Sequence, residues 1–255
     1  MKYCSLLIAS CILLSCEKQT AATAAITGNH LQTETKPAQT IQFSGLTWNV
    51  KHSPGIKIGP GPNRWDKNDV WVDANGYLHL KIRRDSLTNK WFCAEVSTQQ
   101  TFGYGTYQFW VEGRIDQFDK NTVLGLFNYS GNDGYDEMDI EFARWGNKRY
   151  PNLNYTIWPA QQGFNNFSYT KEFTLSGSYT TQRFTRTATS VKLQSLGGFY
   201  NDNTNEFATA TCTNPPNAVS TLAMPVYINL WLFQGKAPSD KKEVEIIIHQ
   251  FTFTP

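Results

Sequence analysis

The sequence predicts an all-β domain, an antiparallel sandwich of two sheets of the jelly-roll type. Three observations lead to this prediction. Short segments in which apolar and polar residues alternate recur along the chain, and a period of two is that of a strand. Turn residues, such as the Asn75-Gly76 pair, separate these segments. No stretch with the apolar period of a helix lasts for three turns, and the 255 residues show neither an internal repeat nor a second domain.

The beginning of the chain is predicted to be a targeting signal followed by a tether. An apolar run over residues 6–14 is too short to span a bilayer, and Ser15 and Cys16 follow it directly. This arrangement resembles a bacterial lipobox, which makes residues 1–15 a signal peptide and Cys16 the lipidated residue. Residues 16–41 are rich in Thr, Ala, Gln and Lys, a composition typical of a flexible tether. We therefore expect a cell-envelope protein held by its lipid anchor at the outer membrane or cell surface, or a secreted protein if the lipobox is not used.

The folded domain is predicted to occupy residues 42–255. Its first part contains a loop rich in Gly and Pro, residues 55–62, which excludes regular structure there. Alternation then predicts strands in series. In chain order these strands are residues 70–72, 77–82, 91–98, 105–115, 122–129, 136–142, 152–158, 190–194, 225–233 and 243–253.

Composition excludes some classes of function. The 23 basic residues nearly balance the 21 acidic ones, so nothing favours nucleic acid as a partner. Separately, we expect the protein to be a monomer. The four His are scattered and no Cys/His spacing resembles a zinc site. Apart from the Cys residues of the predicted signal and Cys16, only Cys93 and Cys212 remain. A disulfide between them is allowed in an oxidising compartment but is not predicted. By parity in its strand, Cys93 shares a face with Glu95.

The segment 136–142 carries the strongest functional signal. Its residues alternate strictly, so Glu137, Asp139 and Glu141 share one strand face while the apolar residues between them enter the core. One interpretation is the polar outer face of an ordinary sheet. Neighbouring carboxylates repel, however, and acidic residues are poor strand formers. A carboxylate site for acid/base and nucleophilic chemistry is therefore the favoured interpretation.

Three carboxyl groups in a row can support cleavage of a glycosidic bond. A retaining mechanism needs a nucleophilic carboxylate and a carboxylic acid about 5–5.5 Å apart. The Cα atoms of Glu137 and Glu141 are about 13 Å apart in a strand, so their long side chains must lean together, helped by sheet twist. Asp139 lies between them and can hold a shared proton that keeps the two pKa values apart.

The motif Glu137-Met138-Asp139-Ile140-Glu141 resembles the Glu-x-Asp-x-Glu signature of glycoside hydrolase family 16, whose members are concanavalin A-like jelly rolls. It has the form found in lichenases and xyloglucan-active members, without an extra residue before the second Glu. The resemblance implies that Glu137 is the nucleophile, Asp139 its assistant and Glu141 the general acid/base. It extends over residues 43–253. Segments 94–107, 126–129 and 229–231 also resemble family strands, the second of these at the position where an aromatic residue lines the cleft.

Parity and the resemblance together predict a groove lined by aromatic and amide side chains, which suits the apolar faces and hydroxyl rim of a sugar chain. The predicted substrate-binding residues are Glu95, Asn128, Tyr129, Tyr135, Trp145, Asn154, Trp158, Asn229 and Trp231. The resemblance implies no required cofactor, with a structural Ca²⁺ as an option found in some relatives.

Departures from the lichenase pattern concern the substrate. Ser97 stands where lichenases carry Arg, and Thr156 stands where they carry Tyr. The loop 130–135 is short, and residues 184–187 lack the Trp and Pro of that strand. We therefore predict a retaining endo-β-glycan hydrolase acting on a polysaccharide or oligosaccharide, with β-glucan first and galactan second. Transglycosylation at the same site and a non-catalytic carbohydrate-binding lipoprotein are the alternatives; a structural envelope protein explains the acids least well.

Overall fold

The computed structural model describes residues 39–255. The predicted signal peptide, the predicted lipidation site Cys16 and all but the end of the predicted tether lie outside these residues. Strand β1 (Thr40–Phe43) starts two residues before the expected domain boundary. Within the described residues, no helix has the length and apolarity needed to cross a membrane.

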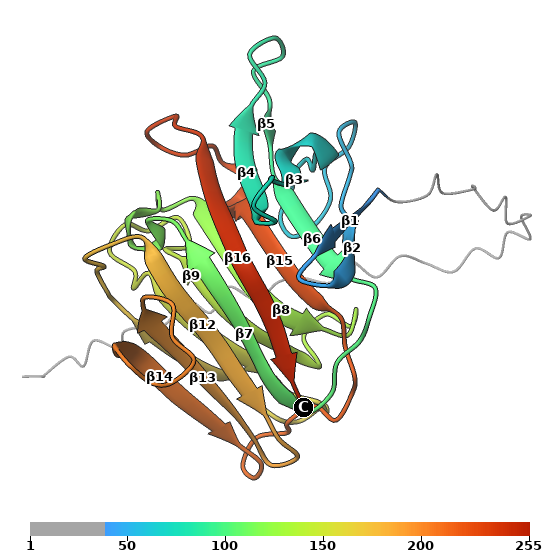
Figure 1. Ribbon diagram of the computed structural model, residues 1–255, viewed down its shortest axis with the longest axis vertical. Helices are drawn as coiled ribbons and strands as arrows, with labels where there is room; N and C mark the ends of the chain where they lie inside the picture. The colour runs from blue at the N-terminus through green and yellow to red at the C-terminus, as the bar shows by residue number, and fades with distance from the viewer. Residues whose placement is uncertain (1–38) are drawn as a thin grey trace, which may run out of the picture. The chain divides into compact units, whose positions relative to one another are not determined.

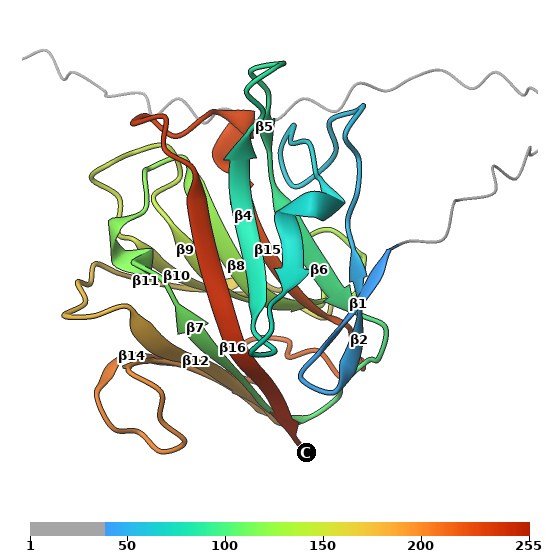
Figure 2. The same cartoon turned by 45° about the horizontal axis from the view of Figure 1, so that its top comes forward.

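Two antiparallel sheets make up the described domain, which confirms the predicted fold class (Figures 1 and 2). Neighbouring strands of the first sheet are, in spatial order, β1, β2 (Leu46–Val50), β6 (Ala94–Thr98), β15 (Val226–Leu232), β8 (Thr122–Tyr129), β9 (Glu137–Ala143), β10 (Leu153–Trp158) and β11 (Phe167–Lys171).

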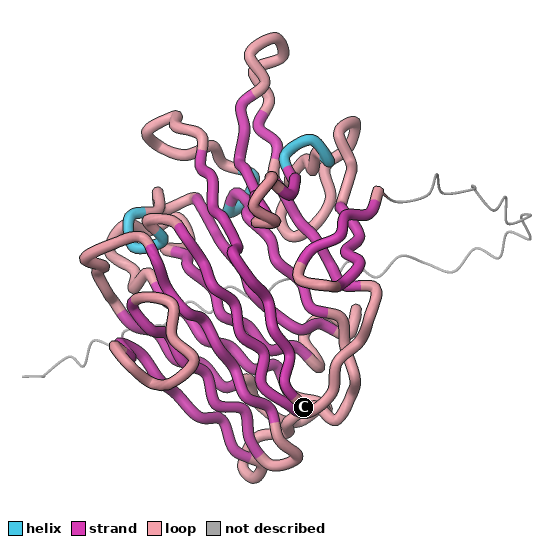
Figure 3. The backbone as a smooth tube through the Cα atoms, viewed as in Figure 1, coloured by secondary structure: helices cyan, strands magenta, loops and turns pink. Residues whose placement is uncertain are grey.

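The second sheet lies against the first across the core. Its strands, in spatial order, are β14 (Glu206–Thr213), β13 (Ser190–Gly197), β12 (Tyr179–Arg186), β7 (Gly105–Glu112), β16 (Val244–Thr254), β4 (Leu78–Arg84) and β3 (Val70–Val72), with β5 (Trp91–Phe92) pairing with β4. Helical structure in the described part is confined to three 3₁₀ turns, η1 (Lys67–Asp69), η2 (Ile115–Gln117) and η3 (Phe233–Gly235) (Figure 3).

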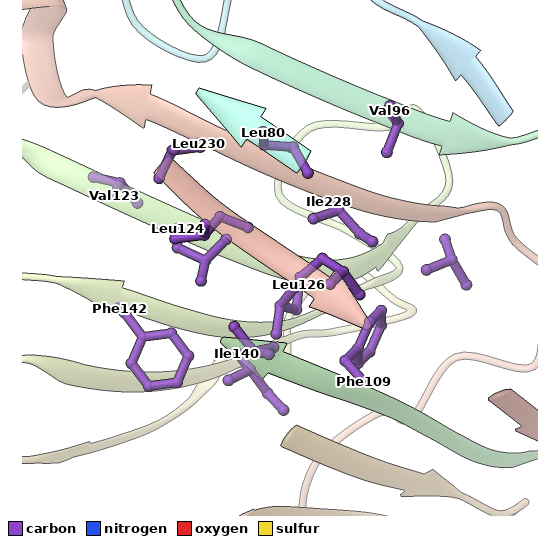
Figure 4. Close-up of a cluster of buried hydrophobic side chains, with 14 of the residues drawn as sticks. Leu80, Val96, Phe109, Val123, Leu124, Leu126, Ile140, Phe142, Ile228 and Leu230 are labelled. Carbon is purple, nitrogen blue, oxygen red and sulfur yellow. The ribbon is translucent and has the colours of Figure 1, made fainter. Parts of the chain in front are cut away.

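Alternation of side chains puts the apolar residues of both sheets into one core. In β9 the apolar positions Ile140 and Phe142 are fully buried, as is Phe109 of β7 in the opposite sheet. Figure 4 shows these side chains together with Leu124 and Leu126 of β8. Since successive side chains of a strand point to opposite faces, burying this face of β9 turns its acidic face outward.

The predicted strand 91–98 is two strands in different sheets. β5 pairs with β4 in the second sheet, whereas β6 pairs with β2 and β15 in the first. The parity argument that placed Cys93 on the face of Glu95 fails at this crossing. Cys93 is fully buried in the core, and Cys212 is also buried; both thiols are free.

The sequence did not predict the edge strands β11 and β14. Each pairs with a neighbouring strand on one side only, so the other side of the strand is open to solvent. The exposed positions in these strands interrupt the alternation that marks a half-buried strand.

Candidate active site

The acidic strand β9 lies between β8 and β10, and the antiparallel register aligns each carboxyl group with one residue on either side. Each such row crosses three strands on the outer face of the first sheet. The rows are Tyr129–Glu137–Trp158, Phe127–Asp139–Thr156 and Gly125–Glu141–Asn154. Aromatic residues therefore flank Glu137 and Asp139, whereas a glycine, Gly125, flanks Glu141.

A hollow of about 480 Å³ opens on this face, and all three carboxyl groups line it. Strands β8 and β15 supply most of its aromatic wall, and the Gly/Pro-rich loop closes another side through Gly59 and Pro60. Besides the acids and these two loop residues, the lining residues are Lys51, Glu95, Phe127, Tyr129, Asp133, Tyr227, Asn229 and Trp231. Apolar rings with a few convergent polar groups are typical of a ligand site.

Burial raises the pKa values of all three carboxyl groups, and the charge of a nearby carboxylate adds to each shift, that of Asp133 in the case of Glu137. Burial raises the pKa of Glu141 to about 8, and the charge of Glu137 adds to the shift. Burial also raises the pKa of Glu137 to about 7, although a hydrogen bond with Asp139 acts in the opposite direction. The pKa of Asp139 is raised well above its usual value by burial and by the charges of both Glu residues. These raised pKa values disfavour a state in which all three carboxyl groups are ionised near neutral pH.

The causes of these pKa shifts favour an ionised Glu137 beside a protonated Asp139. The hydrogen bond between Asp139 and Glu137 lowers the pKa of Glu137 and raises that of Asp139, so the proton stays on Asp139. The indole Nε1 of Trp158 donates to Asp139 Oδ2 over 3.1 Å and orients this carboxyl group. Glu137 thus ionises before Glu141. The strand holds a carboxylate and a carboxylic acid at the same pH, as a nucleophile and a proton donor require.

A second set of hydrogen-bonded polar side chains lies in the hollow beside the three acidic residues. Lys51 Nζ lies 2.8 Å from Glu95 Oε1 and 2.7 Å from the carbonyl oxygen of Gly59. Asn229 Nδ2 donates to Glu95 Oε2 over 3.1 Å. Both carboxylate oxygens of Glu95, which is buried, therefore have a hydrogen-bond partner in the hollow. Sequence reasoning missed Lys51, since it lies in irregular chain just after β2 and only the fold brings it to Glu95.

Gly125 leaves the space that Asn229 occupies. A Cβ atom at residue 125 would lie 2.5 Å from Asn229 Oδ1, closer than side chains pack. We expect Gly125→Ala to lower the free energy of unfolding by about 1–3 kcal/mol because it overpacks this floor. Thermal and denaturant melts measure the change. In an Asn229→Ala background the same substitution should be nearly neutral, and Gly177→Ala, where a Cβ meets nothing within 4 Å, is the matched control. An equal penalty in both backgrounds would contradict the clash.

Four of the predicted binding residues, Glu95, Tyr129, Asn229 and Trp231, line the hollow. Three others lie near it in supporting positions. Trp158 holds Asp139, and Asn154 Oδ1 accepts a hydrogen bond of 3.1 Å from Nε1 of Trp145. The Trp145 ring in turn lies 6.3 Å from the ring of Trp231, centre to centre. Tyr135, in the turn before β9, is not among the lining residues.

The prediction for Asn128 is wrong. Asn128 is fully buried on the core side of β8, where its Nδ2 donates to the carbonyl oxygen of Pro225 over 2.8 Å. Phe127 and Tyr129 face the hollow, so the residue between them must face away. Phe127 was missed, although its parity with Tyr129 was a sufficient signal. Tyr227, two residues before Asn229, was missed in the same way, and its ring stacks on Phe127 at 5.0 Å.

Metal ligation has no support from side-chain clusters in the described part. Between residues 39 and 255 no three His, Cys, Asp or Glu side chains are grouped so that they could hold a metal ion. The structural Ca²⁺ stays a prediction.

The fold and site together define the chain's class: an antiparallel two-sheet jelly roll with a carboxylate-lined hollow on the outer face of one sheet. No protein-family model matches the sequence. A β-glucanase of Bacillus subtilis (strain 168) is 36% identical over 83 residues, which is 31% of this chain and 32% of the relative. The chain therefore matches about a third of the length of that relative.

Solved structures similar to this chain cover most of it. A Bacillus licheniformis β-glucanase has a TM-score of 0.63 at 19% identity, over 86% of this chain and all (100%) of that one. A glycoside hydrolase family 16 endo-glucanase from Bacteroides ovatus has a TM-score of 0.60 at 16% identity, over 81% and 94% of the two chains. A protein of Mycobacterium tuberculosis described as a pseudo β-1,3-glucanase has a TM-score of 0.60 at 16% identity, over 82% and 91%. These likenesses show the jelly-roll fold.

Proposed function

We propose that the protein is a retaining, endo-acting glycoside hydrolase of the family 16 type, with a neutral β-glucan as its foremost substrate and a galactan as the second. One observation carries the proposal: three carboxyl groups on one face of β9 line a single hollow, and their pKa values separate an ionisable Glu137 from a protonated Glu141. The glucanase names of the similar proteins support the same class of substrate.

In the proposed mechanism, the carboxylate of Glu137 attacks the anomeric carbon and forms a glycosyl-enzyme. Glu141 gives its proton to the departing glycosidic oxygen, and then, as a carboxylate, takes a proton from the water that releases the sugar. Asp139 donates its hydrogen bond to Glu137 in the free enzyme and again when Glu137 leaves as a carboxylate. A sugar that replaces this water would turn the same intermediate into a transglycosylation product.

The charges of the hollow support a neutral substrate. Five carboxyl groups line it against one ammonium group, that of Lys51, which Glu95 already pairs. A polysaccharide bearing carboxylate or sulfate groups would meet repulsion with no free cation in the lining to offset it. The lipid anchor at Cys16 and the cell-envelope location belong to this proposal as well, on the lipobox-like sequence alone.

Incubation with a panel of polysaccharides tests the proposal. The panel contains mixed-linkage β-glucan, linear β-1,3-glucan, xyloglucan and β-galactan, and the products are followed by size analysis and proton NMR. We expect a falling chain length from internal cleavage, with the new reducing end first appearing as the β-anomer. Appearance of the α-anomer first would contradict retention.

The pseudo β-1,3-glucanase among the similar structures favours one second candidate, a carbohydrate-binding protein without catalysis. The same panel separates the two. Retention of the protein by a polysaccharide that it does not cleave would favour binding alone.

A further inference from the structure

A second hollow, of about 460 Å³, lies on the outer face of the second sheet, on the far side of the core from β9. In β7 the residues Phe109 and Val111 are fully buried in the core, so Trp110 between them points outward. Trp110 lines this hollow together with His249 and Gln250 of the adjacent strand β16. Figure 1 shows β12, β7, β16 and β4 side by side across this sheet.

Aromatic rings form the walls of this outer hollow. Trp110 stacks on Phe199 with centroids 5.1 Å apart and planes within 7°. The centroid of the Tyr77 ring lies 3.9 Å from that of the His249 ring, and the centroid of the Phe199 ring lies 4.9 Å from it. Tyr179 closes the cluster edge-on and is 49% exposed. The outer face of an antiparallel sheet is commonly polar where water covers it, so a concave group of rings there needs a reason beyond folding.

The lining of the outer hollow contains no Asp, Glu, Lys or Arg side chain. His249 Nε2 lies 2.6 Å from Glu112 Oε2, so the ionisable group of the lining already has a partner. Besides the polar atoms of Tyr77 and Trp110, the lining has the neutral, exposed side chains of Ser44 and Gln250. An ionic ligand would meet no free countercharge in this lining, and a purely apolar ligand would leave the hydroxyl and amide groups unused. A sugar suits both, because its C–H faces pack on rings and its hydroxyls bond to amides and hydroxyls.

A neighbouring hollow of about 360 Å³ continues the surface. It shares Ser44 and Gln250 with the first and extends along β16 past Thr252 to Phe253. The two hollows adjoin at Ser44 and Gln250, so together they offer room for more than one linked sugar.

We infer that this outer surface is a second, non-catalytic binding site for a neutral sugar chain. It goes beyond the proposed function, since it uses none of the carboxyl groups of β9. Such a site would hold a polysaccharide on the enzyme between cleavage events and raise its local concentration at the catalytic hollow.

An NMR titration tests the inference on the full chain. The indole N–H signal of Trp110, assigned by its loss in Trp110→Phe, is followed while cellopentaose, laminaripentaose or a β-galactan pentasaccharide is added to Glu137→Gln protein. We expect at least one sugar to shift this signal in a saturable way. Absence of a shift with all three sugars overturns the inference.

Binding by variants supplies the second readout. Tyr77→Ala and Phe199→Ala are each expected to weaken retention in gels containing mixed-linkage β-glucan about tenfold, while turnover of a short aryl oligosaccharide stays unchanged. Tyr150→Ala, which removes an exposed ring outside the hollow, is the control. Unchanged retention in folded Tyr77→Ala and Phe199→Ala overturns the site. Cleavage without a Trp110 shift would overturn this inference alone, whereas a shift without cleavage would overturn the proposed function alone.

Discussion

Glu137→Gln is expected to lower kcat on a polysaccharide by at least about 10⁴-fold, because the variant has no carboxylate to form the glycosyl-enzyme. The amide has nearly the volume of the acid, and removing a charge that burial disfavours should not lower stability. Initial rates on the best substrate of the panel, with a thermal melt of each protein, measure both effects.

Two further variants sharpen the result for Glu137. Glu245→Gln, on the exposed face of β16, changes the same chemical group outside the hollow and should keep full activity. Glu137→Ala with added azide should regain turnover of an activated aryl glycoside and release an α-glycosyl azide, since the small anion attacks from the vacated side. Activity close to that of the wild type in Glu137→Gln would show that the nucleophile lies elsewhere.

Glu141→Gln is expected to show an effect that depends on the leaving group. A sugar hydroxyl needs a proton to leave, so we expect a loss of about 10²- to 10⁴-fold on polysaccharide. A dinitrophenolate leaves without protonation, and the first step on a dinitrophenyl glycoside should stay near the wild-type rate. Pre-steady-state release of dinitrophenol followed by slow turnover measures this. Equal losses on both substrates would contradict a role in proton donation.

The pH profile of the same variant gives an independent check. The active form holds Glu137 ionised, so activity should fall as the pH drops through about 7, the raised pKa of Glu137. It also holds Glu141 protonated, so activity should fall as the pH rises through about 8, the raised pKa of Glu141. Glu141→Gln cannot lose this proton, and its residual activity should therefore lack the alkaline decline while keeping the acidic one.

The fold and the centre of the site followed from strand periodicity, for a physical reason. In β9 a core face and a site face alternate residue by residue, so a single strand carries both signals at once. Asn229 and Trp231 of β15 and Tyr129 of β8 were predicted from the resemblance of their segments to family strands together with parity, and the sheet places both strands close to β9.

Errors arose where local periodicity does not describe the chain. Asn128 was predicted within segment 126–129, although it alternates with Tyr129 and therefore faces the core. Cys93 was misplaced because the chain changes sheets between β5 and β6, a crossing with no mark in the sequence. Lys51 and Asp133 lie outside the strands and reach the hollow through tertiary structure alone. The outer hollow was not predicted either, because its rings come from segments far apart in the chain.

The positions of β15 and β16 have a consequence for how the protein is made. β15 pairs with β6 and β8 inside the first sheet, and β16 pairs with β7 and β4 inside the second (Figure 1). Hairpins such as β8–β9 can form on a nascent chain as soon as it leaves the ribosome. The first sheet, however, cannot close until residue 232 has been synthesised, and the second cannot close until residue 254 has been. Asn229 and Trp231 belong to β15. The hollow around the carboxyl groups of β9 can therefore be completed only after most of the chain has been translated.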